Sequence, residues 1–170
     1  ALAELAVENM LLHCASTSLV ENGGEISAVS SVPLNVGIYA GTSPLSGRIG
    51  FHLTAEDFPI GIATSSATVS HALNFGEADA AVVIADTASL ADAAAKAVCN
   101  AVRGSDFEAS IQFGLEKAET IPCVRSALII RGKYVGTVGK LPKLLRLSGD
   151  IGQLFTSGLH DIAPQEFIVL

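Results

Sequence analysis

Short apolar segments alternate with clusters of turn residues along much of the chain, a pattern that predicts β-strands. The predicted strands cover residues 19–21, 25–29, 35–40, 48–53, 59–64 and 78–85. Asn22, Gly23 and Gly24 form the predicted turn between the first two strands, because glycine adopts a positive φ at little cost. Residues 1–14 differ, since their apolar positions recur at helical spacing and predict an amphipathic helix. The stripe contains Leu2, Leu5, Ala6, Met10 and His13.

Two further helices are predicted after the last of these strands. Residues 86–104 are rich in alanine, the strongest helix former. Ser89 and Asp92 have the spacing of a capping box, in which Asp92 is only a first-turn carboxylate favoured by the helix dipole. Ser105 and Glu108 repeat that spacing and open a second predicted helix, which extends to about residue 118.

The remaining chain predicts a hairpin and a less regular tail. Residues 127–130 and 134–138 flank a short Gly-containing turn, which is a hairpin signature. Residues 140–170 form an irregular C-terminal extension that begins with a local basic patch, KLPKLLR. Strands early in the chain and a helix pair later favour an α+β (mixed α/β) fold, with a mixed β-sheet and flanking helices, in one domain that covers residues 1–170.

Composition narrows the class of protein. Apolar residues make up 49% and charged residues 16% of the 170 positions, which excludes disorder. No apolar run approaches the ~18 residues that a membrane-spanning helix needs. The net charge of −7 disfavours nucleic-acid binding. The low charged fraction, against about 25% in typical domains, fits a homo-oligomer. No signal peptide is visible, and the start at Ala1 without Met leaves room for an upstream segment.

The three cysteines, Cys14, Cys99 and Cys123, bear on compartment and reactivity. Their odd number and wide spacing give neither a zinc pattern nor a disulfide framework, so we expect a reducing, cytoplasmic environment. Cys99 lies on the apolar stripe of its predicted helix and is expected to be buried. Cys123 follows Pro122 near the start of a strand and is the candidate for an exposed, reactive thiol.

A hydroxyl-rich segment is the main candidate for a ligand site. It contains Thr64, Ser65, Ser66, Thr68 and Ser70, and His71 follows directly. These hydroxyl and backbone groups are able to donate hydrogen bonds to a phosphate. The alternative is a loop whose hydroxyls bond to their own backbone, with the histidine as a structural residue. The residues alone leave these two interpretations about even.

Two other segments are candidates for the same site. The turn at Asn22, Gly23, Gly24 and Glu25 lets the backbone approach a planar ligand closely, although the turn alone explains its glycines. Asp92 is either the first-turn carboxylate described above or a metal ligand at the start of the helix.

Four ordered blocks carry a resemblance to a known family. The segments VENGGEI, VGIYAGTSPLSGRIGF, IGIATSSATVSHALNFGEADA and SLADAAAKAV together resemble the small branch of the ApbE-like superfamily, over about residues 19–138. The larger members are FAD:protein FMN transferases, also called thiamine-biosynthesis lipoproteins. The resemblance implies an ApbE-like fold with a flavin cleft, in which Mg²⁺ bridges the FAD pyrophosphate while FMN passes to a client protein.

The same resemblance implies roles for individual residues. Gly23, Gly24 and Glu25 would line the flavin, Thr64 and Ser65 would be the Thr-Ser pair before the catalytic His71, and Asp92 would be a catalytic metal ligand. Two departures weaken the implied chemistry. Lys96 stands where the larger enzymes have a threonine ligand, so its ammonium is able to replace the metal. No Asp-Pro-x-x-Gly run follows the histidine.

We therefore expect a protein that binds FAD, FMN or another phosphate-bearing ligand in a cleft, with transferase-type, magnesium-dependent chemistry toward a protein client as an extension. One alternative is a sulfur-trafficking or accessory protein in sulfide assimilation toward homocysteine, which would use Cys123. A second alternative is a structural oligomer without catalysis.

Overall fold

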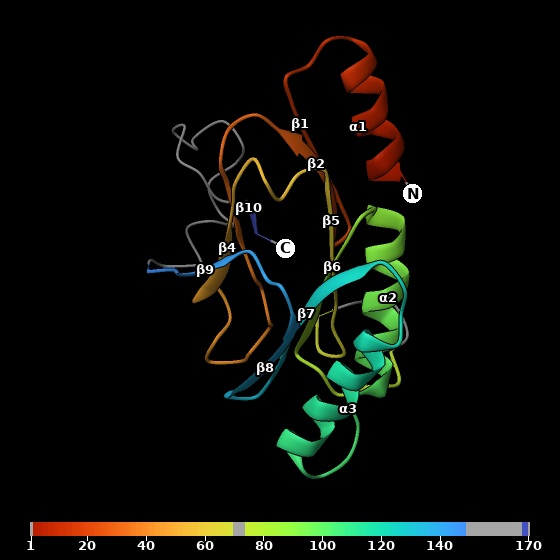
Figure 1. Ribbon diagram of the computed structural model, residues 1–170. Coiled ribbons are helices and arrows are strands. Elements are labelled where there is room, and N and C mark those ends of the chain that lie inside the picture. Colours follow the sequence, from red (N-terminus) through yellow and green to blue (C-terminus); the bar gives the residue numbers. More distant parts are fainter. Residues whose placement is uncertain (1, 70–73, 149–167, 170) are drawn as a thin grey trace.

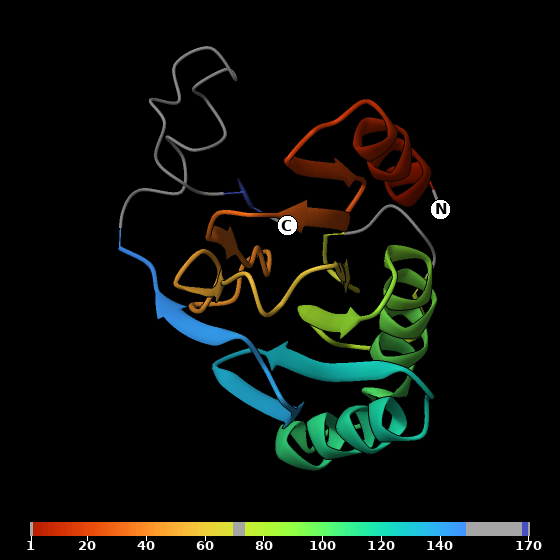
Figure 2. The same ribbon diagram turned by 45° about the horizontal axis from the view of Figure 1, so that its top comes forward.

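The protein has three layers, shown by a computed structural model that describes residues 2–69, 74–148 and 168–169 (Figure 1, Figure 2). A six-stranded sheet lies in the middle. Helices cover one of its faces and a four-stranded sheet covers the other, so that the molecule has two hydrophobic cores. The prediction of an α+β fold is confirmed at this level.

The described helices all lie on the same face of the six-stranded sheet (Figure 1). They are α1 (Leu2–Leu12), α2 (Ala88–Ala101) and α3 (Phe107–Glu119). Helix α1 packs on the first two strands, α2 on the middle of the sheet, and α3 on its last two strands. Helix α2 therefore has the most central position, beside the strands that carry the hydroxyl-rich segment.

The six-stranded sheet is antiparallel throughout and has the order β1-β2-β5-β6-β7-β8. Its strands are β1 (Thr17–Asn22), β2 (Glu25–Ser30), β5 (Ile60–Ser65), β6 (Ala80–Ala85), β7 (Val124–Arg131) and β8 (Tyr134–Gly139). The four-stranded sheet has the order β10-β3-β4-β9, and its β10–β3 pair is parallel. Its strands are β3 (Leu34–Gly37), β4 (Ile49–Leu53), β9 (Lys143–Arg146) and β10 (Ile168–Val169). Strand β9 lies within the tail that we expected to be irregular.

Strand β6 contributes side chains to both hydrophobic cores, and all six of its residues are buried. Its side chains alternate between the two faces of the sheet. Ala81 and Val83 pack toward the helices, whereas Val82 and Ile84 pack toward the four-stranded sheet. Small side chains on the helical face let α2 approach closely, and at Gly61 an added Cβ would overlap the backbone of Thr87. The close approach of α2 to β5 follows from these small residues.

Both capping boxes were predicted at the wrong residues. Helix α2 is capped by Thr87, whose hydroxyl accepts a hydrogen bond from the backbone N–H of Leu90 at 3.2 Å. Ser89 instead donates its N–H and hydroxyl to the carboxylate of Glu4. Helix α3 is capped by Asp106, which accepts from the N–H of Ala109 at 3.1 Å. In each case the side-chain oxygen of a nearby residue of a capping type takes the role.

Helix α1 buries a different face from the one that an amphipathic helix with the predicted stripe would bury. Ala3 and Val7 are buried against the sheet, while Leu2 and Leu5 are 68% and 64% exposed. The two small side chains allow α1 to lie close to β1 and β2. The larger leucines consequently project away from the core.

Candidate functional site

A group of polar side chains connects the end of β5 with the middle of α2. We call Ser65, Ser66, Asn74, Lys96 and Cys99 the Lys96 cluster. Ser65 and Ser66 are 6% and 4% exposed, Cys99 is fully buried, and Asn74 and Lys96 are half-buried. The cluster therefore has a buried base formed by Ser65, Ser66 and Cys99, and Asn74 and Lys96 are its partly exposed residues.

Asn74 is the central residue of the cluster. Its amide oxygen accepts a hydrogen bond from the Lys96 ammonium at 2.8 Å and another from the Ser65 hydroxyl at 3.2 Å. Its amide nitrogen donates to the backbone carbonyl of Ser66. These three contacts fix the orientation of the amide and hold the ammonium beside the end of β5.

The sheet register and a tight crossing bring these residues together. Ser65 pairs with Ala81, and both side chains point toward the helices. The segment after Asn74 then crosses α2, where the backbone N–H of Phe75 donates to the Asn100 side chain at 2.8 Å. At Gly76 an added Cβ would overlap the carbonyl oxygen of Cys99, so only glycine permits this crossing. Residues that are 22 positions apart, Asn74 and Lys96, meet for this reason.

The buried base of the cluster changes the acidity of its thiol. Burial raises the pKa of Cys99 above the ordinary value of 9.0. A hydrogen bond with Ser65 and the charge of Lys96 oppose this effect but do not overcome it. Cys99 is therefore a neutral thiol at physiological pH and is a poor nucleophile, as expected for a buried cysteine.

The hydroxyls that we predicted to act together have separate environments. The Ser66 hydroxyl accepts hydrogen bonds from the backbone N–H groups of Thr68 and Val69 at 3.1 and 3.0 Å, as in the alternative of a self-bonded loop. The hydroxyl of Thr64 is buried on the opposite face of the sheet from Ser65, without a hydrogen-bond partner among the described residues. Ser65 alone points from this segment into the Lys96 cluster.

The turn at Asn22–Glu25 lies beside the hydroxyl-rich segment, as we expected of two segments that form one site. The backbone N–H of Thr64 donates to the carbonyl of Gly24 at 2.9 Å, and an added Cβ at Gly24 would lie 3.2 Å from the Thr64 carbonyl oxygen. Asn22 and Gly23 complete the turn, and both glycines have positive φ. The Glu25 carboxylate is buried and accepts from the N–H of Ala3 at 3.3 Å, so it serves the start of α1.

Two of the predicted residues, Ser70 and His71, lie outside the described residues. Asp92 is exposed on α2, one helical turn before Lys96. Within the described ranges, no group of three or more His, Cys, Asp or Glu side chains is placed to hold a metal ion. The structure therefore places Asp92 on the same helix as the Lys96 cluster and gives it no partner carboxylate for a metal in that part of the chain.

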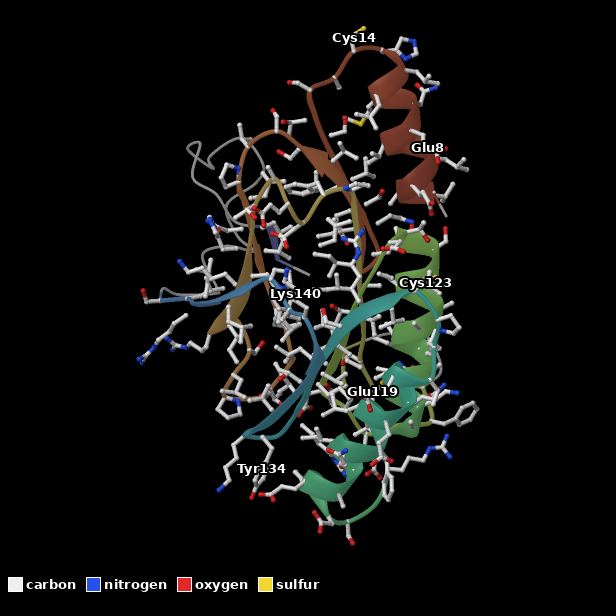
Figure 3. The ribbon with its side chains drawn as sticks, in the orientation of Figure 1. Glu8, Cys14, Glu119, Cys123, Tyr134 and Lys140 are labelled. Carbon is white, nitrogen blue, oxygen red and sulfur yellow. The ribbon has the colours of Figure 1, made fainter. Side chains whose placement is uncertain are left out.

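The other two cysteines are at the surface. Figure 3 shows Cys14 in the turn after α1 and Cys123 before β7. The predicted burial of Cys99 and exposure of Cys123 are confirmed. Both exposed cysteines have a positive φ, 65° for Cys14 and 64° for Cys123, which reflects tight turns.

A surface hollow lies away from the Lys96 cluster, between β4 and β9. Its lining combines leucines with two arginines and includes Pro44, Leu45, Arg48, Leu144, Arg146 and Ser148. Ser148 borders the undescribed residues 149–167, and we assign no ligand to this hollow.

Sequence reasoning missed Asn74 and read Lys96 only as a replacement for a metal ligand. A signal for both exists in the sequence. Lys96 is the single basic residue of an alanine-rich helix, and Asn74 is a polar residue that closes the hydroxyl-rich segment. Their contact depends on how α2 lies against β5, which no local pattern specifies.

Comparison with known proteins gives consistent matches. A family model described as "AbpE bacteria" matches residues 1–114. A UPF0280 protein of Methanocaldococcus jannaschii is 41% identical over 159 residues, which cover 91% of this chain and 64% of that protein. UPF0280 proteins of Methanococcus vannielii and Methanocella arvoryzae are 42% and 43% identical over 146 residues; the matches cover 85% and 86% of this chain and 59% and 58% of those proteins. The chain thus spans about three fifths of the length of these relatives.

These matches correct the family that we inferred from the four sequence blocks. They point to the UPF0280 family and not to the ApbE-like superfamily of flavin transferases, so that assignment was wrong. Short glycine-rich and alanine-rich blocks are explained by turns and close helix packing in this fold, as at Gly24 and Gly61, and such blocks recur without shared chemistry. Among the described helices, none is long and apolar enough to cross a membrane.

Proposed function

The chain belongs to the UPF0280 family, and we propose that its Lys96 cluster binds the phosphate group of a small molecule. The observation that carries this proposal is the 2.8 Å contact between the Lys96 ammonium and the Asn74 amide oxygen. That contact holds a cation at the end of β5 in a protein with a net charge of −7. An ammonium attracts phosphate as a compact point charge.

The groups around Lys96 suit a phosphate rather than an apolar ligand. The Ser65 hydroxyl and the Lys96 ammonium both donate hydrogen bonds to the amide oxygen of Asn74, so the two donor groups lie close together. A hydroxyl is able to rotate and donate to a ligand oxygen. Small residues dominate the adjoining strand and helix, including Ala63 and Ala95.

The competing interpretation is structural. The same contacts tie the segment that begins at Asn74 onto α2, together with the hydrogen bond between Phe75 and Asn100. In that case Lys96 would stabilise the protein and would have no ligand. The two interpretations differ in whether removal of the Lys96 charge changes binding or only stability.

Flavin, magnesium and transferase chemistry stay predictions, as do a protein client and a cytoplasmic location. They came from the family resemblance or from composition, and the Lys96 cluster supports only the phosphate part of the hypothesis. FMN and FAD remain suitable probes because each carries phosphate. The sulfur-trafficking alternative also stays a prediction, supported only by the exposure of Cys123.

Equilibrium dialysis with matched ligands tests the proposal. Pyrophosphate, FMN and FAD are compared with riboflavin, which has the flavin ring without phosphate. We expect the phosphate-bearing ligands to bind and riboflavin to bind at least roughly tenfold more weakly, a difference of about 1.4 kcal/mol. Equal binding of riboflavin and FMN would assign recognition to the ring, and no binding of any of the four would end the proposal.

A further inference from the structure

Helix α1 has an apolar face that nothing in the described structure covers. Leu2, Leu5 and Leu12 are 68%, 64% and 80% exposed. The opposite face of the helix carries Ala3 and Val7, which are buried against β1 and β2. Helix α1 is therefore bifacial: one side is packed in the protein, and the other presents leucines to solvent.

The exposed side chains have the spacing of a coiled-coil seam. Leu2, Leu5, Asn9 and Leu12 stand at positions i, i+3, i+7 and i+10, which are the a, d, a and d positions of two heptads. Asn9 is exposed like the leucines. A single Asn at an a position is the device by which two-stranded coiled coils fix their register and number of strands.

We propose that α1 pairs in parallel with α1 of a second copy of this chain, and that this seam forms a homodimer. A two-fold axis along the seam places each leucine against the same leucine of the partner and pairs the two Asn9 amides. Such an isologous contact needs a self-complementary surface. The heptad spacing supplies that surface.

Glu8 and His13, which lie beside the seam, favour the same partner and orientation. Glu8 occupies a g position, and His13 lies in the turn directly after Leu12, where the heptad pattern places the following e position. Both are exposed, and Figure 3 labels Glu8 on α1. In a parallel pair, a g residue faces the e residue of the next heptad in the partner. Glu8 of one copy thereby faces the imidazole of the other. The hydrogen bond between the His13 Nδ1 atom and the Asn9 carbonyl, at 2.9 Å, holds that ring at the end of the seam.

A membrane surface suits α1 less well than a second copy does. The helix contains Glu4 and Glu8 and no Lys or Arg. Interfacial helices that bind anionic lipid carry basic residues on their polar face. The exposed carboxylate of Glu8 would be repelled by such a surface.

Sedimentation velocity over a range of protein concentrations tests the dimer. A variant with both Leu5→Glu and Leu12→Glu places carboxylates in the seam without touching the buried face. We expect the dimer dissociation constant to rise by roughly tenfold or more. Val135→Glu is the matched control, because Val135 is 48% exposed on β8, away from α1. Circular dichroism melting confirms that both variants fold.

Disulfide trapping tests the parallel orientation independently. In a background with both exposed cysteines replaced, Cys14→Ser and Cys123→Ser, Asn9→Cys is expected to form a disulfide-linked dimer under mild oxidation, because the two a positions are adjacent. Leu11→Cys, at a c position, is the control and should stay monomeric. A wild-type protein that is monomeric at its highest soluble concentration, or a dimer that the double glutamate variant does not weaken, would overturn the proposal. Trapping through Leu11→Cys in place of Asn9→Cys would overturn the seam.

Discussion

The ammonium nitrogen of Lys96 lies 2.8 Å from the amide oxygen of Asn74. This contact joins α2 to the segment that follows the hydroxyl-rich stretch, and the Ser65 hydroxyl converges on the same oxygen. A buried thiol, that of Cys99, lies beneath them. The stability of the crossing and the chemistry of the cluster are therefore coupled, which leads to measurable consequences.

The crossing at Gly76 predicts a large cost for a single methyl group. Gly76→Ala would push a Cβ into the Cys99 carbonyl oxygen, so the segment must move off α2. We expect a loss of about 2–3 kcal/mol in the free energy of unfolding, measured by urea denaturation. Gly23→Ala is the control, because Gly23 has a positive φ but no atom within 4 Å of an added Cβ. It should cost only about 1 kcal/mol, and equal losses in both variants would contradict the close approach.

The buried thiol of Cys99 predicts a dependence of stability on alkaline pH. Burial raises its pKa in the folded state above the ordinary 9.0. The folded protein therefore keeps the thiol proton to a higher pH than the unfolded chain does. The resulting contribution to the free energy of unfolding is fully present below pH 9.0 and is lost as the pH rises through the pKa of the folded state. In urea denaturation at pH 8, we expect the free energy of unfolding of wild type to exceed that of Cys99→Ala by about 1 kcal/mol. This difference should shrink as the pH rises from 8 to 10.5. An advantage that is constant over this range would contradict the shift.

The contact between Glu4 and Ser89 predicts a dependence on acidic pH. Hydrogen bonds from Ser89 lower the pKa of Glu4 below the ordinary 4.5. Stability from this pair is therefore present above pH 4.5 and is lost as pH falls through the lowered pKa. Ser89→Ala should cost about 1 kcal/mol at pH 7 and progressively less toward pH 3, measured by denaturant unfolding. Ser148→Ala is a control at an exposed serine and should show no such trend; a cost for Ser89→Ala that does not fall with pH would count against the pair.

The strands were predictable because each has a local signal. Strand β6 is a fully apolar run of strand length, and the β1–β2 and β7–β8 hairpins close at glycines that the structure finds at positive φ, Gly23, Gly24 and Gly132. Strand β9 escaped prediction because its four residues, Lys143–Arg146, are mostly exposed and pair at one side with β4. Such a short, charged edge strand lacks an apolar period.

The choices that depend on packing were not predictable. Helix α1 has apolar residues on two faces, and the pattern does not indicate whether Ala3 and Val7 or the leucines are buried. The cap of α2 is Thr87, and Ser89, inside the first turn, instead bonds to Glu4, a residue 85 positions away.

The candidate site depended on the same kind of long-range information. The sequence indicated the hydroxyl-rich segment, and the structure assigns its hydroxyls to different faces and partners. Strand alternation predicts that Thr64 and Ser65 point apart. It cannot indicate that Asn74 returns over α2 to meet Lys96, since that contact requires the strand order β5-β6 and the helix above it.

Isothermal titration calorimetry of FMN binding to wild type, Lys96→Gln and Lys117→Gln tests the central claim most directly. Lys117 lies in the last turn of α3 and matches Lys96 in charge change without touching the cluster. If the Lys96 cluster binds phosphate, Lys96→Gln should weaken binding by roughly tenfold or more while Lys117→Gln leaves it within about twofold of wild type. Binding that Lys96→Gln leaves unchanged, with all three proteins folded, would contradict the account and leave Lys96 as a purely structural residue.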